Sequence, residues 1–207
     1  MMTRTTRPRG VFGTVRQWHW ISSALCLIGM LLFALTGITL NHAAAISAEA
    51  KVRTVELVVP AEVLASLTGP EGGEGPLPAG LRKWLADRHG LLVPADAAGE
   101  WDDMEVYVSL PRPGGDAWLS LDLDSGELLY ERTDRGWISY LNDLHKGRNT
   151  GLAWSWFIDI FAVACVVFCL SGLLLLYRHT GTRPSTWPLV GMGLVIPLLL
   201  VVLFVHS

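Results

Sequence analysis

Four of the six histidines lie where long apolar segments meet polar ones. His19 and His42 bracket the first apolar segment, and His145 and His179 bracket the second. An ionisable side chain is costly inside hydrocarbon, so its placement at both ends of two segments calls for a common explanation. Axial ligation of two b-type haems, one near each membrane face, accounts for all four histidines together. The pattern therefore predicts a protein that moves electrons across a membrane.

Three apolar segments are long enough to cross a bilayer, at residues 21–40, 154–177 and 187–205. A helix needs about 20 apolar residues to span about 30 Å of hydrocarbon. The first segment is too long for a signal-peptide core and lacks a small-residue cleavage pattern, so we interpret it as a retained anchor. The predicted fold class is an α-helical membrane protein with three transmembrane helices.

The distribution of charge predicts the orientation. Two short stretches carry basic residues and no acids: Arg4, Arg7, Arg9 and Arg16 before the first span, and Arg178 and Arg183 after the second. The positive-inside rule places both stretches in the cytoplasm, which predicts a bacterial inner-membrane protein with residues 43–150 and the C-terminus in the periplasm. Residues 43–150 hold 18 of the 19 acidic and 10 of the 16 basic residues, a formal charge of −8. This acidic region and the absence of a basic cluster with interleaved aromatics argue against a nucleic-acid partner.

The segment between the first two spans predicts a small α+β domain. Strand patterns occur at 52–59, 103–110, 117–122 and 127–132, and helical patterns at 61–67 and 81–89. The Gly- and Pro-rich stretch 71–78 predicts a flexible loop. The predicted organisation is a cytoplasmic N-terminus at 1–17, helix 18–42, the α+β domain at 43–135, an amphipathic interfacial helix at 136–150, helix 151–178, a cytoplasmic loop at 179–186 and helix 187–206.

Antiparallel spans predict which histidines share a haem. His19 and His179 fall at the cytoplasmic face, and His42 and His145 at the outer face. Twenty-three residues separate His19 from His42, about 35 Å along a helix, which places the two haems near opposite faces. His145 and His179 are 34 residues apart, about 51 Å if helical, which overshoots the bilayer. The helix must therefore break or tilt at 147–151, or His145 must reach back from the interfacial helix.

Two alternatives to this ligand set stay open. His206 ends the third span at the outer face and competes with His145 or His42 as an axial ligand. In the second alternative, the four histidines bind no haem and only lie at the membrane interface, as side chains with a polar tip often do.

Three charged residues are candidate cofactor-binding residues. Asp159 is the only acid within a span, which makes it a candidate to accept a hydrogen bond from a ligating imidazole or a proton from a quinol. Arg16 and Arg178 flank His19 and His179 and are candidates to pair with haem propionates. In the alternative interpretation, these two arginines only fix the orientation of the protein in the membrane, as the positive-inside rule describes.

The histidine motifs resemble the PepSY-associated transmembrane helix family. The matching stretches are RQWHW at 16–20, LTGITLNH at 35–42, DLHKGR at 143–148 and LSGLL at 170–174. Larger relatives include membrane reductases that use two b-type haems to reduce ferric siderophores outside the inner membrane. The resemblance implies haem ligation by His19, His42, His145 and His179, and a PepSY-like α+β module. Larger members have four or more spans, so a second copy or a membrane partner is expected to complete the core.

Two functions follow from these observations. The first is a b-type cytochrome with two haems that takes electrons from a quinol or a cytoplasmic donor and passes them outward to a ferric chelate, which would make the chain a haem-dependent oxidoreductase. The second is a non-enzymatic, membrane-anchored PepSY-type module that binds a periplasmic peptidase or a membrane partner. The sequence contains no nucleophile motif, phosphate-binding loop or hydrolytic constellation, so no catalytic residue is predicted.

Overall fold

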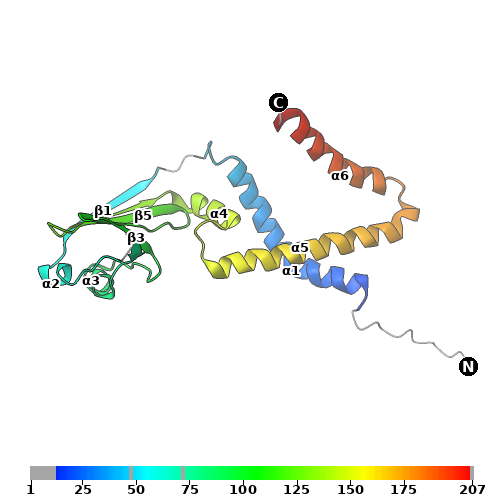
Figure 1. Cartoon of the computed structure of the whole chain (residues 1–207). Helices are drawn as coiled ribbons and strands as arrows, with labels where there is room; N and C mark the ends of the chain where they lie inside the picture. The colour runs from blue at the N-terminus through cyan, green and yellow to red at the C-terminus, as the bar shows by residue number, and fades with distance from the viewer. Residues whose placement is uncertain (1–12, 47–48, 71–72, 206–207) are drawn as a thin grey trace, which may run out of the picture. The chain divides into compact units, whose positions relative to one another are not determined.

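The computed structural model describes residues 13–46, 49–70 and 73–205. The chain forms two compact units. The first comprises residues up to Leu32 and from Trp156 onward, and the second comprises Phe33–Ser155. Figure 1 shows the elements in chain order, with the first helix in blue and the last in red.

Three helices are long and apolar enough to span a membrane, as predicted. They are α1 at Val15–Asn41, α5 at Leu152–His179 and α6 at Thr186–Leu200, which continues as a π-helical turn at Val201–Val205. A short 3-10 turn, Thr180–Thr182, precedes α6. Their leucine, isoleucine and valine side chains are largely exposed, which is the surface that lipid tails require. The chain is therefore a membrane protein.

A six-stranded antiparallel sheet lies in the second unit, with the strand order β1-β6-β5-β4-β3-β2. The strands are β1 at Lys51–Val58, β2 at Glu74–Pro76, β3 at Ala98–Trp101, β4 at Glu105–Ser109, β5 at Gly115–Asp122 and β6 at Glu127–Asp134. The first and last strands are neighbours, and Lys51 is paired with Asp134. The chain therefore enters and leaves the sheet at the same end, which allows the sheet to be inserted between two spans.

Two strands differ from the sequence expectation. The stretch 71–78 was expected to be a loop, but β2 lies within it and pairs with β3, which carries no alternating pattern. Pro76 is accommodated because β2 is an edge strand, where a missing N–H removes no ladder bond. The strand β3 forms because it pairs with β4. The residues of β3 alone do not reveal this pairing.

One face of the sheet forms the core of the domain. Figure 1 shows α2 at Ala61–Leu64 and α3 at Ala79–His89 on the same side of the sheet. Alternate residues of β5 are buried on this side, including Leu119 and Leu121, and they pack with Leu81 and Leu85 of α3. The left-handed Gly90 ends α3 at the residue that the sequence predicted.

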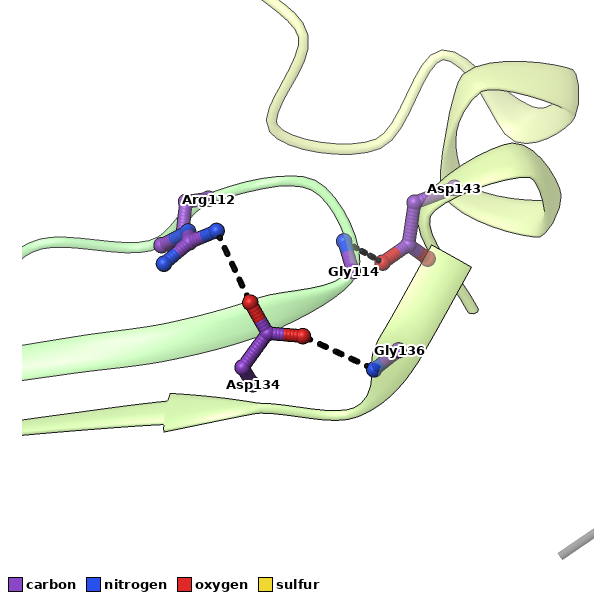
Figure 2. A network of polar contacts seen from close by, with 5 residues as sticks. All are labelled: Arg112, Gly114, Asp134, Gly136 and Asp143. Atoms are coloured by element: carbon purple, nitrogen blue, oxygen red, sulfur yellow. Dashed lines mark hydrogen bonds and ion pairs between the residues drawn. The ribbon is translucent and has the colours of Figure 1, made fainter. Parts of the chain in front are cut away.

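The Asp134 carboxylate makes the stability of this domain sensitive to acid. Its pKa lies below the usual value, mainly because the backbone N–H of Gly136 donates a hydrogen bond to it at 2.8 Å, and also because of nearby positive charge from Arg112, Arg132 and Lys51 (Figure 2). A depressed folded-state pKa contributes stability above the unfolded value, about 4, and that contribution is lost as pH falls through the folded value.

We expect the melting temperature of the wild-type domain to fall more steeply with decreasing pH, below about pH 4, than that of the Asp134→Asn variant. The difference should appear in circular-dichroism melts of the detergent-solubilised chain at pH 6 and pH 3. Equal acid sensitivity of the two proteins would contradict this role of Asp134.

Candidate functional site

His19, in the first unit, docks onto α5. Its Nδ1 lies 3.0 Å from Oγ of Ser171, and its ring stacks on Phe168 with centroids 4.8 Å apart and planes 15° apart. A Cβ at Gly172 would lie 3.3 Å from Cε1 of His19, so the glycine lets the ring approach the helix. We call Phe168, Ser171 and Gly172 the His19 cradle.

His145, in the second unit, docks onto α1 in the same way. It lies near the C-terminus of α4, Gly136–Lys146, and its Nδ1 is 2.7 Å from Oγ1 of Thr36. Its ring lies 4.9 Å from that of Phe33, and its Cε1 lies 3.6 Å from where a Cβ would stand on Gly37. We call Phe33, Thr36 and Gly37 the His145 cradle.

The hydrogen bonds of the two cradles favour one position of the imidazole proton. The hydroxyl of Ser171 lies 3.0 Å from the carbonyl of Phe168, and that of Thr36 lies 3.1 Å from the carbonyl of Phe33. When its single proton is donated to that carbonyl, the hydroxyl accepts from the histidine. In this arrangement Nδ1 of His19 and of His145 is the donor, and the lone pair is left on Nε2.

His42 and His179 have the same tautomer for a simpler reason. Their Nδ1 atoms face backbone carbonyls of their own helices, Ile38 at 3.0 Å and Leu175 at 2.8 Å. A carbonyl only accepts, so Nδ1 donates in both residues. A metal-ligating histidine typically donates its other ring N–H to such an oxygen, which orients the ring and leaves Nε2 for the metal. All four predicted ligands show this arrangement.

The two cradles share a sequence pattern that the sequence analysis missed. Residues 33–37 read Phe-Ala-Leu-Thr-Gly, and residues 168–172 read Phe-Cys-Leu-Ser-Gly. In both, a phenylalanine and a hydroxyl residue three positions later face one histidine, and the following glycine lies beside its ring. The recurrence of Phe-x-x-Ser/Thr-Gly in two spans was the available signal. Which histidine each copy receives depends on helix packing.

The rings of the predicted ligand pairs do not touch each other. No hydrogen bond or ring contact joins His19 to His179, or His42 to His145, in the described part of the chain. His42 directly follows α1 and lies six residues after Thr36, and His179 lies eight residues after Ser171 on α5. At 1.5 Å per residue these offsets are about 9 Å and about 12 Å along each helix.

The helix α4 connects the sheet to the His145 cradle. The helical conformation is interrupted between α4 and α5, where Gly147 and Gly151 have positive φ. The 34-residue separation of His145 and His179 predicted this interruption. Two buried residues of α4 hold it to different parts of the second unit: Asn142 accepts from Thr39 of α1 at 2.8 Å, and Asp143 accepts from the Gly114 N–H at 2.9 Å. Figure 2 shows the Asp143 carboxylate facing the loop before β5. The sheet therefore positions the helix that carries His145.

The remaining candidates lie apart from the cradles. Arg16, Arg178 and Asp159 are exposed, and none makes a hydrogen bond or ion pair with another described residue. Asp159 accepts none of the four Nδ1–H bonds, and its predicted role toward a quinol stays a prediction. His206 lies outside the described residues. The described chain holds no group of three or more metal-ligating side chains, and a haem with two axial histidines needs none.

Comparison with known proteins identifies one family. The family described as PepSY_TM-like matches residues 11–206, which includes all three spans, the sheet and both cradles. No curated protein and no solved structure matches the chain.

Proposed function

Because the chain belongs to the PepSY_TM-like family of membrane proteins, we propose that it is a b-type cytochrome that moves electrons across the bacterial inner membrane. The observation that carries the proposal is that Nδ1 of each of His19, His42, His145 and His179 lies within hydrogen-bond distance of an oxygen of the chain, an arrangement that leaves Nε2 for a ligand. Neutral imidazole with an Nε2 lone pair is the form that ligates haem iron.

Four histidines of this kind would supply the axial ligands of two haems. His19 and His42 stand near opposite ends of α1, which has 27 residues. His19 and His179 would hold one haem, and His42 and His145 the other. Haem b supplies reversible one-electron iron chemistry when it is bound. The contribution of the chain is to hold the rings, orient Nε2 and exclude water, since the surrounding phenylalanine and leucine side chains are apolar.

The orientation follows from the charges. The basic N-terminus and the link between α5 and α6 are placed in the cytoplasm, and the sheet domain in the periplasm. Electrons would enter from a quinol or a cytoplasmic donor and leave at the periplasmic face to a ferric chelate. The exposed apolar surfaces of α1, α5 and α6 leave room for lipid, a second copy or a membrane partner.

Electron transfer between two aqueous compartments tests the proposal directly. The purified chain is incorporated into liposomes that contain ferricyanide, and a reduced quinol is added outside. We expect the entrapped ferricyanide to be reduced faster than in protein-free liposomes, and the His19→Ala variant to lose this activity. The matched control is His89→Ala, in the sheet domain beside Trp84, which should retain it. Equal rates with and without protein would contradict the proposal.

The cradle hydroxyls are expected to tune the haems. Thr36→Val and Ser171→Ala each remove the acceptor of one Nδ1–H bond and leave the proposed ligands in place. Loss of such an outer-shell partner typically costs 10- to 100-fold in metal affinity. We therefore expect partial haem loss and a shifted midpoint potential for one haem in each variant, measured by redox titration. Ser155→Ala, which removes a hydroxyl of α5 that bonds the Gly151 carbonyl and contacts neither cradle, is the control. Unchanged potentials in both cradle variants would contradict the assigned role.

A further inference from the structure

Basic side chains gather at one end of the core face of the sheet. Arg53 of β1 is directly opposite Arg132 of β6, so the two side chains emerge on the same face. Like charges directly opposite each other on paired strands are destabilising. This pair stands in a segment whose formal charge is −8, where an acidic partner would have been easy to provide. A bound anion would relieve this repulsion, although both side chains are exposed to solvent.

A third arginine, from the loop before β5, reaches the same end of the sheet. One guanidinium nitrogen of Arg112 lies 3.5 Å from Asp134, a single long contact instead of a bidentate pair. The other terminal nitrogen, Nη1, is buried and has no hydrogen-bond partner among the described residues. In Figure 2 one guanidinium nitrogen points toward Asp134 and the remaining ones point away. A buried guanidinium donor without an acceptor costs free energy that a bound oxygen would recover.

Two of these arginines line an open cavity. Arg112 and Arg132 stand in the wall of a space of about 660 Å³, within the size range of small-molecule sites. The guanidinium of Arg132 makes no hydrogen bond or ion pair within the described ranges. Most of the remaining wall is apolar, including Leu92, Leu110 and Ala117. The cavity also contains the hydroxyls of Ser109 and Tyr130 and the carboxylate of Asp96.

We propose that this cavity binds a ligand that carries a carboxylate on an apolar body. The planar guanidinium groups of Arg112 and Arg132 match the two oxygens of a carboxylate, and the apolar wall matches the rest of the ligand. The net charge at this end of the sheet is +2, because four basic side chains outnumber two carboxylates. The basic residues are Lys51, Arg53, Arg112 and Arg132, and the acidic ones are Asp96 and Asp134. One carboxylate of a ligand therefore creates no excess of negative charge. The C-terminus of a peptide and a non-peptide organic acid both have this chemistry. The proposal does not depend on haem.

Binding is measured by ligand-observed NMR titration of the full chain in detergent micelles. The probes are N-acetyl-leucine for a peptide terminus, phenylacetate for a non-peptide acid, and N-acetyl-leucine amide as the uncharged control. We expect at least one of the two acids to bind and the amide not to bind. The acid that binds more tightly shows whether the natural ligand is a peptide C-terminus or a non-peptide acid. Arg112→Gln and Arg132→Gln should each weaken binding by about tenfold or more, whereas Arg88→Gln on α3 should not.

A variant that binds the acid more weakly while gaining stability shows that the loss of binding is not caused by misfolding. Arg53→Thr removes the like-charge opponent of Arg132, so it should raise the melting temperature of the ligand-free chain and weaken acid binding. Equal binding of acid and amide, equal loss in Arg88→Gln, or no binding of either acid would overturn the proposal. So would a lipid-phosphate site, which would show as an Arg112-dependent rise in melting temperature in phosphatidylglycerol nanodiscs without binding of either acid.

Discussion

Replacing His145 by alanine is expected to remove about half of the b-type haem from the purified protein and to leave the other half bound, because each of the two proposed haems would have its own histidine pair. His145 contacts α1 in the second unit, whereas His19 contacts α5 in the first, so the loss should be confined to one site. Haem per chain is measured by the pyridine haemochrome assay together with the reduced-minus-oxidised spectrum.

Two further variants make this result specific. His19→Ala should remove the other half, and the double variant should be colourless. His89→Ala, outside both cradles, should keep the full wild-type haem content. If His145→Ala retained all haem, the outer ligand would be a different histidine, with His206 as the remaining candidate at that rim, and the His145 cradle would be a helix-packing contact only.

The second large effect is expected at Gly114. Its φ is +73°, and a Cβ there would lie 2.7 Å from the backbone Cα of Tyr140 on α4. The left-handed conformation costs an L-residue about 1–2 kcal/mol, and overpacking adds about 1–3 kcal/mol. Gly114→Ala should therefore destabilise the second unit by about 2–5 kcal/mol, measured as a loss of melting temperature by circular dichroism.

Gly80→Ala is the matched control for this substitution. A Cβ at Gly80 meets nothing within 4 Å, and the residue lies in α3, so alanine should stabilise by up to about 1 kcal/mol. Since Gly114 also donates to Asp143, its substitution displaces α4 and with it His145. We expect Gly114→Ala to shift the midpoint potential of one haem only. Wild-type stability and unchanged potentials in Gly114→Ala would contradict the coupling.

Local patterns predicted much of the fold. The three spans, the helix α4 and the four longer strands each show a pattern that can be recognised within ten to thirty residues of sequence: an apolar stretch of sufficient length, the period of a helix face or the alternation of a strand. The short strands β2 and β3 have no such signal. Gly75 and Pro76 disfavour strand structure locally, and β2 forms because β3 provides its hydrogen bonds.

The site was predicted in part. Topology alone selected His19, His42, His145 and His179, and the 34-residue separation of the last two predicted the break before α5. The cradle partners were missed because they depend on which faces of α1 and α5 meet, and the spacing of residues along one chain does not carry that information. Ser171 and Gly172 were interpreted only as small residues that allow close helix approach.

The haem content of the wild-type protein distinguishes a cytochrome from a binding module. The chain is purified in detergent from haem-replete cells, and the pyridine haemochrome assay is combined with a potentiometric titration. We expect about two haems b per chain, with two resolvable midpoint potentials and a reduced spectrum of bis-histidine type. A colourless preparation that is folded by circular dichroism would contradict this expectation, and the histidines would then be interfacial residues of a binding module.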